Sequence, residues 1–495
     1  MIVLALFLFV TVLFLGSVRW LRWLGILQQK EYRLDRLLLF LGSGEGFLEI
    51  FKVFPKAQEL SRTGLKRPKI TSRIIVVLVV SGCISVALYF IFWYLILLSS
   101  VPVHSYFLPS IAAGIVTILL PVIVLASALP TAFISQILTT LYLQRASALL
   151  KKSSPIIIGI TGSYGKTSTR QLLTHCIGKC QSVFSPPHSY NTKLGIANSI
   201  LAGYHGQSLV LLEFGAYAPG EIKALTKYFP PQMVMLTGFS PQHVGLFGSE
   251  EGIAKAKAEL VQSLPENAMV FYNADDAGVQ RIFDAANRSD VQKIPYEKTH
   301  KGEWQFPHLT EQATAEFEWK GEKITTRIVG LHYLSNLSGA VTVASLFHCV
   351  GEKIIESIRE YKPSEHIIKI YTTTNDVTIL DDGDTANPQG FSAVLDVLAA
   401  LPQKPKVLIT PGIIDLSTST NRIHTPLAEK SESIVDTVLY VGEPGQSVFK
   451  KLLGERCVTA VSEVQNAIRN LKGGSVLCIE GKLPQWAMKE IAKLG

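Results

Sequence analysis

Three long apolar runs dominate the first third of the chain. They cover residues 2–24, 74–98 and about 111–135, and each is nearly free of charged side chains. A helix needs about 20 apolar residues to cross the hydrocarbon core of a bilayer. The pattern therefore predicts three transmembrane helices. The third contains Pro121 and Pro130, which membrane helices tolerate.

The charged residues indicate how these helices are oriented. Residues 1–150 hold 13 Lys and Arg against 5 Asp and Glu, which accounts for the whole formal charge of +8, while the remainder balances at 34 against 34. Ten of the basic residues fall between Lys30 and Arg73, whereas the link at 99–110 has no Lys, Arg, Asp or Glu. By the positive-inside rule, the loop 25–73 and everything after the third helix are cytoplasmic. An excess confined to the membrane part does not indicate a nucleic-acid partner.

Two features of this region have a second interpretation. A cleaved signal peptide could also explain the first run, but residues 1–24 lack a basic start and a small-residue cleavage site. We therefore expect the first helix to be retained. The segment 34–54 mixes apolar and charged residues around glycines, which fits either a small helical hairpin or a segment lying on the membrane surface.

Beyond residue 143, short apolar runs alternate with helical periodicity. β-branched residues at 156–158 begin a buried strand, and further strands are predicted at 208–216, 232–238 and 268–276. The same alternation continues after about residue 375, which is typical of a parallel sheet covered by helices. The fold class is therefore α/β. The predicted parts are a membrane region at 1–143, a central parallel-sheet domain at 144–370 and a C-terminal Rossmann-like domain at 371–495.

A glycine-rich turn follows the first of these strands. Gly159, Gly162 and Gly165 precede Lys166 and Thr167, which begin a helix. Such a turn cradles a polyphosphate because its backbone N–H groups and the helix N-terminus face the phosphates, the lysine reaches the terminal phosphates, and the hydroxyl can hold Mg²⁺. The G-x-x-G-K-T spacing is shorter than the usual G-x-x-x-x-G-K-[ST], so an ordinary strand-to-helix turn is the alternative. The strand–turn–helix context favours a nucleotide site.

Other side chains lie where α/β sheets keep their sites. Glu213 ends an apolar strand, where a carboxylate can hold Mg²⁺ facing the phosphates, although a strand-end glutamate is more often structural. His243 in a loop and Lys257 in the following helix would, alone, be ordinary surface residues. The six cysteines have no metal-binding spacing, which predicts reduced thiols and no zinc site. They are Cys83, Cys176, Cys180, Cys349, Cys457 and Cys478.

The order of the motifs carries more information than any one of them. Along residues 155–482 the chain contains, in sequence, GITGSYGKTST, NTKLGI, EFGAYAPGEI, HVGLFGSEEGIAKAKAEL, NADD, GLHYLSNLSGAVTVA, DDGDTANPQGFSAVL and VLITPGIIDLS. This series resembles the Mur ligase superfamily, most closely its members that add D-alanyl-D-alanine to a peptidoglycan precursor. The resemblance covers about two thirds of the chain. It implies a central P-loop ATPase domain followed by a Rossmann-like domain.

The resemblance assigns roles by position. It implies that Lys166, His243 and Lys257 are catalytic, and that Lys257 matches a lysine which is carbamylated to become a metal-bridging acid. It places Asn336 at the adenine side of ATP, and Asp382 and Asn387 near the ribose and phosphates. The other implied nucleotide-binding residues are Gly162, Ser163, Gly165, Thr167 and Ser168. The implied ligands of two Mg²⁺ ions are Thr167, Glu213, His243 and Lys257.

The implied chemistry joins a carboxylate to an amine. The γ-phosphoryl group of ATP moves onto the carboxylate, and the amine then attacks the acyl phosphate to give an amide, ADP and phosphate. Two anions must approach each other in the first step, so Mg²⁺ and Lys166 are needed to offset their repulsion. A carbamate on Lys257 would turn a repelling cation into a metal-binding anion.

The chain also departs from the family. His366 stands at the position of a phosphate-binding arginine, Gly383 and Thr385 alter the DSYNANP element, and Glu480 reverses a charge in VKGSR. A further stretch fits either substrate binding or turn structure, and its residues are Thr410, Gly412, Asp415 and Asn421. Most importantly, the apolar runs stand in place of the usual N-terminal domain that binds a UDP-sugar.

These observations predict a membrane-anchored, ATP- and Mg²⁺-dependent carboxylate–amine ligase of cell-envelope synthesis. We expect it in the bacterial inner membrane with its catalytic domains in the cytoplasm. Its expected partners are a lipid- or UDP-linked precursor acid, an amino acid or dipeptide amine, and membrane lipid. Two alternatives stay open: a polyglutamate-type synthetase at the membrane, and an ATP-binding membrane scaffold without ligase activity.

Overall fold

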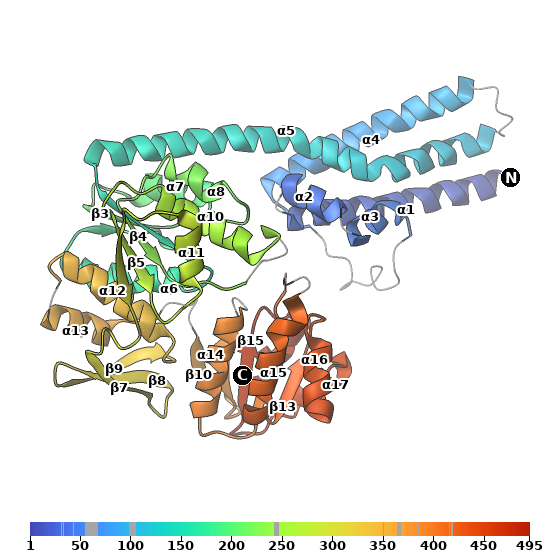
Figure 1. Cartoon of the computed structure of the whole chain (residues 1–495). Coiled ribbons are helices and arrows are strands. Elements are labelled where there is room, and N and C mark those ends of the chain that lie inside the picture. The colour runs from blue at the N-terminus through green and yellow to red at the C-terminus, as the bar shows by residue number, and fades with distance from the viewer. Residues whose placement is uncertain are drawn as a thin grey trace. The chain divides into compact units, whose positions relative to one another are not determined.

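The structure, a computed structural model, divides the chain into two compact units, residues 1–141 and 142–495 (Figure 1). Helix α5 (Leu108–Ser153) contributes residues to both. The residues that the structure describes are 1–30, 32, 34–42, 44–54, 68–98, 105–241, 247–349, 351–363, 368–383, 387–414, 416 and 419–495.

The first unit consists of helices. The predicted apolar runs form α1 (Ile2–Gln29), α4 (Ser72–Leu98) and the first part of α5, and each of the three helices is long and apolar enough to cross a membrane. A short 3-10 turn, η2 (Ser105–Phe107), precedes α5. Between α1 and α4, α2 (Leu34–Leu41) and α3 (Gly44–Phe51) form the hairpin that was one of the two interpretations of this segment.

Close packing joins the long helices of this unit. A Cβ on Gly16 of α1 would lie 2.9 Å from Thr117 Oγ1 of α5, so the glycine allows the two helices to approach. Trp20 Nε1 donates a 2.9 Å hydrogen bond to Ser81 Oγ of α4. The predicted third run, 111–135, is only part of α5, which continues through Pro121 and Pro130 as a single helix of 46 residues.

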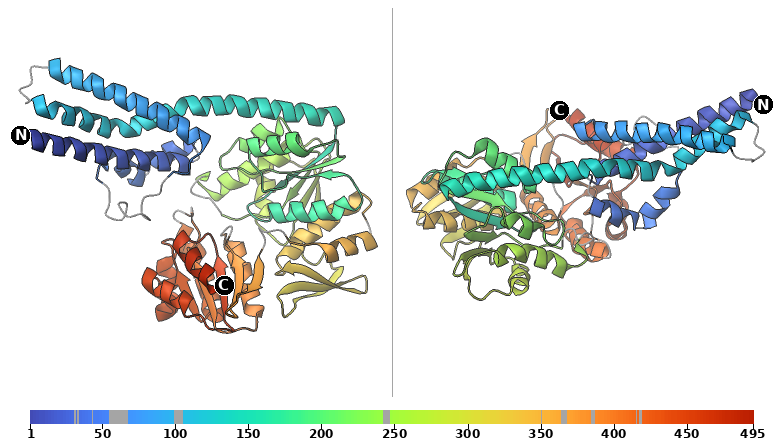
Figure 2. Two further views of the ribbon diagram at one scale, coloured as in Figure 1. Left: turned by 180° about the vertical axis from the view of Figure 1, so that it is seen from behind. Right: turned by 90° about the horizontal axis from the view of Figure 1, so that it is seen from above.

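The second unit contains a six-stranded parallel sheet in the order β2-β3-β1-β4-β5-β6. The strands are β1 (Ile156–Thr161), β2 (Val183–Phe184), β3 (Leu209–Glu213), β4 (Met233–Leu236), β5 (Met269–Asn273) and β6 (Gln292–Tyr296). Helices cover both faces (Figures 1 and 2). They are α6 (Lys166–Gly178), α7 (Lys193–Gly203), α8 (Glu221–Thr226), α10 (Glu250–Gln262), α11 (Val279–Ala286), α12 (Tyr333–Leu346) and α13 (Glu352–Glu360).

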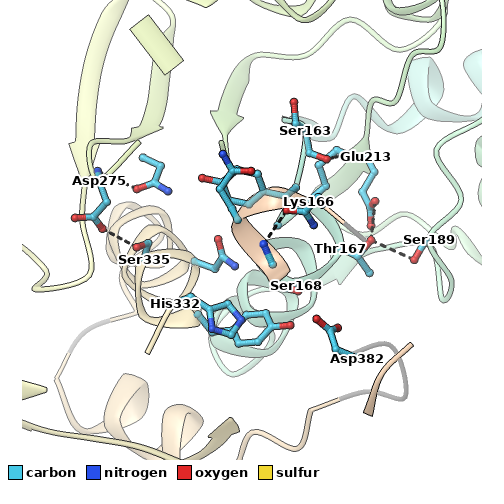
Figure 3. A pocket seen from close by; sticks show the side chains of 18 of the residues that line it. Ser163, Lys166, Thr167, Ser168, Ser189, Glu213, Asp275, His332, Ser335 and Asp382 are labelled. Carbon is cyan, nitrogen blue, oxygen red and sulfur yellow. Dashed lines mark hydrogen bonds between the residues drawn. The ribbon is translucent and has the colours of Figure 1, made fainter. Parts of the chain in front are cut away.

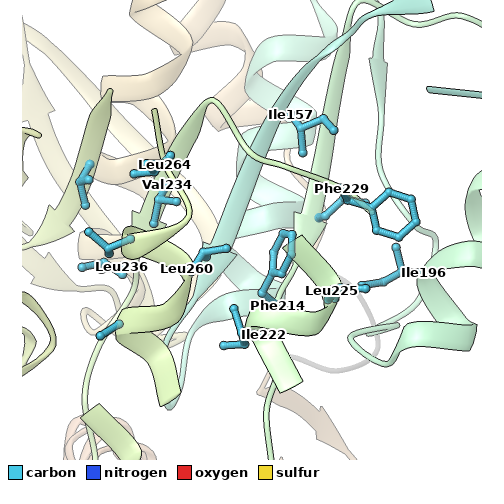
Figure 4. Packing of buried hydrophobic residues seen from close by; sticks show 14 of the residues in the cluster. Ile157, Ile196, Phe214, Ile222, Leu225, Phe229, Val234, Leu236, Leu260 and Leu264 are labelled. Atoms are coloured by element: carbon cyan, nitrogen blue, oxygen red, sulfur yellow. The ribbon is translucent and has the colours of Figure 1, made fainter. Parts of the chain in front are cut away.

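Alternating side chains of β1 fill two cores, one on each face of the sheet. Ile157 packs with α7, α8, α10 and the end of α5, as Figure 4 shows in part, whereas Ile158 and Ile160 pack with α6 and α12. A small antiparallel sheet of β7 (Trp304–Leu309), β8 (Thr314–Trp319) and β9 (Glu322–Val329) extends the second core. The β-branched residues therefore form the buried strand that the sequence predicts.

The C-terminal part forms a second six-stranded sheet in the order β10-β11-β15-β12-β13-β14. Its strands are β10 (Lys369–Thr372), β11 (Thr378–Asp382), β12 (Lys406–Thr410), β13 (Thr437–Tyr440), β14 (Cys457–Val458) and β15 (Val476–Glu480). The edge strand β10 is antiparallel to β11, whereas the other strands of this sheet pair in parallel as predicted. The covering helices are α14 (Pro388–Ala400), α15 (Thr420–Ile434), α16 (Gln446–Leu453), α17 (Val461–Arg469) and α18 (Gln485–Ile491).

The prediction that all cysteines are reduced was also wrong. Cys180 and Cys349 form a disulfide with a Cα–Cα distance of 5.7 Å, and the other four cysteines are free. Cys180 follows α6 and Cys349 follows α12, and these two helices pack side by side. The tertiary fold therefore brings together two residues that are 169 positions apart.

Candidate functional site

The glycine-rich turn connects β1 to α6 as the sequence predicts. Gly165 has a φ of +76° and ends the turn, and α6 begins at Lys166. Gly162 has no room for a side chain, because a Cβ there would lie 2.1 Å from Thr237 Oγ1. Lys166 Nζ donates hydrogen bonds to the carbonyl oxygens of Gly162 at 2.7 Å and Ser163 at 3.4 Å. Burial lowers the pKa of Lys166, and the neighbouring Glu213 opposes this shift.

This turn forms one wall of a cavity of about 540 Å³. Both domains of the second unit contribute to its lining. In Figure 3, Thr167, Ser189 and Glu213 lie on one side of Lys166, and Asp275 and Ser335 lie on the other. The predicted site residues that line the cavity are Ser163, Gly165, Lys166, Thr167, Ser168, Glu213, Asn336, Asp382 and Asn387.

The predicted carboxylate lies at the end of β3 and is held from two sides. Glu213 is 1% exposed, and its Oε1 accepts a 2.6 Å bond from Arg170 Nε while its Oε2 accepts a 3.0 Å bond from Thr167 Oγ1. Arg170 also donates to Ser185 Oγ and to the Pro186 carbonyl at 2.6 Å. Arg170 therefore joins the P-loop helix, the end of β3 and the loop that leads to Ser189. Its position four residues after Lys166 places it on the same helix face, a signal that sequence reasoning missed.

Carboxylate and hydroxyl oxygens are the donors that Mg²⁺ prefers. Glu213 Oε2 and Thr167 Oγ1 both lie at the cavity, so these two residues fit a Mg²⁺ ion. The part of the chain that the structure describes has no cluster of three His, Cys, Asp or Glu that could hold a metal without further ligands. Phosphate oxygens and water would have to complete the coordination, which is usual for Mg²⁺.

The predicted lysine of α10 is buried but is not part of the cavity lining. Lys257 is 7% exposed and makes no hydrogen bond or ion pair with any described residue. Burial, together with the charge of Lys166, lowers its pKa well below the usual value. The neutral amine is therefore favoured at this position. His243, which is predicted to lie beside it, falls outside the described residues, as do His366, Thr385 and Asp415.

A second group of polar side chains lines the cavity beside α12. Asn336 lies against the turn, because a Cβ on Gly165 would be 3.0 Å from its Oδ1. Asp275 accepts a 2.6 Å bond from Ser335 Oγ and another 2.6 Å bond from the Lys298 backbone N–H. The sequence placed the NADD motif at a strand end but did not assign Asp275 to the site. His332 also lines the cavity, and burial lowers its pKa to about 4.

The C-terminal domain supplies the opposite wall. Asp382 ends β11 beside the cavity, and Asn387 caps α14 by accepting a 2.9 Å bond from the Gly390 N–H. Glu480 of β15 pairs in register with Asp382 of β11 and is fully buried, so the two carboxyl groups interact directly. Burial, together with Asp382, raises its pKa well above the usual value.

Thr410 and Gly412, in the stretch that sequence analysis left open, form a turn. Gly412 has a φ of +75°, and its N–H donates a 3.0 Å bond to Thr410 Oγ1. A Cβ on Gly412 would lie 2.2 Å from the Pro444 carbonyl oxygen. Neither of these residues, nor Asn421, belongs to the cavity lining.

Comparison with known proteins shows what the central domain is similar to. Residues 160–344 match the Mur ligase middle domain. The UDP-N-acetylmuramoyl-tripeptide--D-alanyl-D-alanine ligase of Mycobacterium tuberculosis is 32% identical over 257 residues, which are 50% of each chain. The ligase of the same name from Bacillus subtilis is 25% identical over 63% of this chain and 68% of its own. This chain thus spans about half the length of its mycobacterial relatives.

Among solved structures, MurF ligase from Thermotoga maritima in complex with ADP has the same fold. It superimposes with a TM-score of 0.61 at 22% identity, covering 72% of this chain and 83% of that chain. At this identity the match is evidence for the fold alone. The predicted α/β fold with a parallel central sheet is confirmed.

Proposed function

We propose that this chain, whose residues 160–344 form a Mur ligase middle domain, is an ATP-dependent carboxylate–amine ligase of peptidoglycan precursor synthesis. One observation carries the proposal. Lys166, Thr167 and Glu213 open into the same cavity as Asp382 and Asn387 of the C-terminal domain. A cavity of about 540 Å³ between two domains suits a nucleotide whose terminal phosphate meets a second substrate.

In this proposal the turn binds the ATP phosphates. The N–H groups at the start of α6 face the phosphates, and Lys166 exchanges its bonds to Gly162 and Ser163 for bonds to the terminal phosphates. Asn336 and the Asp275–Ser335 pair lie on the other side of the turn, where the nucleoside would be held. Asp382 and Asn387 complete the site when the C-terminal domain meets the nucleotide.

Thr167 and Glu213 would hold Mg²⁺, with Arg170 fixing the orientation of the carboxylate. The ion would offset the charge that spreads over the γ-phosphoryl group during transfer to the acid. Lys166 contributes a second positive charge from the protein itself. The amine substrate then attacks the acyl phosphate carbon, the C–O bond to phosphate breaks, and the amine loses its proton.

We also propose that Lys257 is carbamylated. Lys257 is buried, has no anionic partner and lies near the cation Lys166. These surroundings favour its neutral amine, which is the form that reacts with CO₂. The carbamate would be an anion beside the cation Lys166, so the two groups would attract each other. Intact mass spectrometry under CO₂-buffered, non-acidic conditions would detect the added group. A peptide that stays unmodified, together with full activity in Lys257→Met, would contradict this role.

The substrates follow from the relatives and from the first unit. The names of the relatives specify a UDP-linked muramoyl tripeptide and D-alanyl-D-alanine. We propose a precursor acid of the same class, and we favour a lipid-linked acid because three helices suited to crossing a membrane occupy residues 1–153. Anchoring in the inner membrane would confine the search for such an acid to the plane of the bilayer.

Phosphate release tests the ligase. The full chain, purified in detergent, would be assayed with ATP, Mg²⁺, UDP-linked or lipid-linked muramoyl peptides, and a panel of amines that includes D-alanyl-D-alanine and glutamate. We expect release that requires both acid and amine. Lys166→Ala should abolish it, and Lys179→Ala, just after the same helix, should not. Phosphate release without an amine, or no phosphate release with any pair of acid and amine, would contradict the ligase and favour the scaffold without ligase activity. Repeated addition of glutamate would indicate a polyglutamate-type synthetase.

The membrane anchor has its own test. Full-length protein in native membranes should resist extraction with alkaline carbonate, whereas a chain starting at residue 142 should be soluble. If the shortened chain uses lipid-linked and soluble acids as well as the full chain does, the proposed reason for the anchor fails. The ligase proposal would be unaffected by that result.

A further inference from the structure

The first membrane helix contains an arginine whose hydrogen-bonding groups are only partly satisfied. Arg19 of α1 is 2% exposed, and its Nη2 donates to the carbonyl oxygen of Ile50 in α3. Its Nε and Nη1 have no hydrogen-bond partner, and it makes no ion pair among the residues that the structure describes. A guanidinium carries its charge at any physiological pH, so burial without an anion is costly.

Trp23 adds a second donor on the same face of α1. It lies four residues after Arg19, so the two side chains project from one side of the helix. Its ring is fully buried, and its indole Nε1 also lacks a partner within the described part of the chain. Arg19 and Trp23 therefore leave three donor nitrogens on one face of α1 without a partner, and a ligand with acceptor oxygens would satisfy them.

The neighbouring charges do not supply the missing anion. Glu49 of α3 lies 3.4 Å from Arg22 and 3.2 Å from Lys52, so this carboxylate serves two cations already. Arg22 Nη1 also donates a 3.2 Å bond to the Lys52 carbonyl oxygen. Glu49 also attracts Arg19, but it is shared with Arg22 and Lys52, and Arg19 forms no ion pair of its own among the described residues.

The position of Arg19 along the helix bundle indicates where the ligand comes from. Its neighbour Trp20 bonds Ser81, which lies nine residues after the start of α4 at Ser72, or about 14 Å along the helix. This level lies within the apolar part of α4 rather than at its end. Ionisable residues at such depth mark binding sites or pathways, because they are too costly to keep otherwise.

We propose that Arg19 and Trp23 bind the phosphate group of an anionic lipid. A guanidinium can place two parallel N–H bonds on a phosphate, and the indole N–H can reach a third oxygen. The lipid phase delivers a phosphate on an acyl or isoprenoid chain to this depth, whereas a free anion would have to leave water. Because Arg19 is nearly covered, the end of α3 around Ile50 must shift when the lipid enters.

This inference depends on the proposed membrane location but not on ligase activity. The full chain would be purified in detergent, stripped of lipid, and titrated with phosphatidylglycerol, phosphatidylcholine or inorganic phosphate, with bound lipid counted by native mass spectrometry. We expect the wild type to retain phosphatidylglycerol, and Arg19→Gln to weaken retention about tenfold or more, since charge-assisted hydrogen bonds are lost. Arg73→Gln is the matched control, because it removes an arginine of the same unit that bonds Thr131 instead.

The outcomes separate the possible failures. Equal retention by wild type and Arg19→Gln, or no retained lipid phosphate in the wild type, would overturn the inference. Displacement of the lipid by millimolar inorganic phosphate would assign the site to a soluble anion and overturn it as stated. If Arg19→Gln does not fold, Arg19→Lys replaces it. This variant keeps the positive charge but loses the two parallel N–H donors of the guanidinium, so we expect it to retain the lipid several-fold more weakly. Carbonate extraction of the same preparations shows independently whether the membrane proposal holds.

Discussion

Arg170 fixes the position of Glu213, one of the two residues of the proposed magnesium site. It is 3% exposed and pairs with Glu213, which is 1% exposed, at 2.6 Å. Removing one partner of a buried ion pair leaves an uncompensated charge and costs about 3–5 kcal/mol. Arg170→Met should therefore lower the free energy of unfolding of the second unit by this amount, measured by urea denaturation.

Two controls distinguish this effect from the general cost of a mutation. Lys179→Met breaks an exposed ion pair with Glu360 just after the same helix and should hardly change the denaturation midpoint. The double variant Arg170→Met, Glu213→Gln should recover part of the loss, because no lone charge stays buried. A small effect of Arg170→Met alone would show that water reaches Glu213.

Glu480 makes the stability of the C-terminal domain depend on pH. Burial raises the pKa of its carboxyl in the folded state, so between the unfolded and the folded pKa the folded state binds more protons. The stabilisation from the protonated form is complete below the unfolded pKa and is lost as the pH rises toward the folded pKa. Glu480→Gln should raise the unfolding midpoint at pH 8 and change it little near pH 4. The exposed Glu455→Gln is the control, and a pH-independent effect of Glu480→Gln would contradict the assignment.

At the scale of elements, the disulfide connects the C-terminal ends of α6 and α12, two helices that both contribute residues to the cavity lining. Without reductant, the denatured protein should show four reactive thiols, and with reductant it should show six. Closing a loop of 169 residues stabilises a fold by about 5 kcal/mol on chain-entropy grounds. Cys349→Ala should lower the midpoint in non-reducing buffer only. Six thiols before reduction would show that the pair is open in the purified protein.

Elements were predictable where local chemistry determines them. The β-branched run at 156–158, the glycines of the turn and Lys166 gave β1, the turn and α6 at the observed positions. The same stretch gave Thr167, and the apolar strand at 208–216 gave Glu213, and both residues line the cavity. Contacts between distant segments were not predictable, because no local pattern encodes them. Arg170 on Glu213, Lys298 on Asp275, and the disulfide all depend on the tertiary fold.

At the scale of the whole molecule, the two-sheet α/β architecture followed from alternating strands and helices. The length of α5 was not predicted. After residue 135 its apolar residues no longer surround the helix but lie on one face, which hides the continuation of the same helix. The final turns of α5 are not a linker, since Leu143, Ala146 and Leu150 are buried in the core of the central domain. Ser147 Oγ also donates a 2.8 Å bond to the Tyr228 carbonyl oxygen.

This packing makes the end of α5 part of the second unit, and matched leucines on one helix test it. Leu150 is 3% exposed and Leu141 is 44% exposed. Truncating a buried leucine costs about 2–5 kcal/mol because a cavity remains, whereas an exposed leucine has little to lose. In the full chain, Leu150→Ala should lower the urea midpoint of the second unit, and Leu141→Ala should not. Likewise, a chain starting at residue 142 should be markedly more stable than one starting at residue 154. Equal stability of these two shortened chains would mean that the sheet does not need the helix beside Ile157.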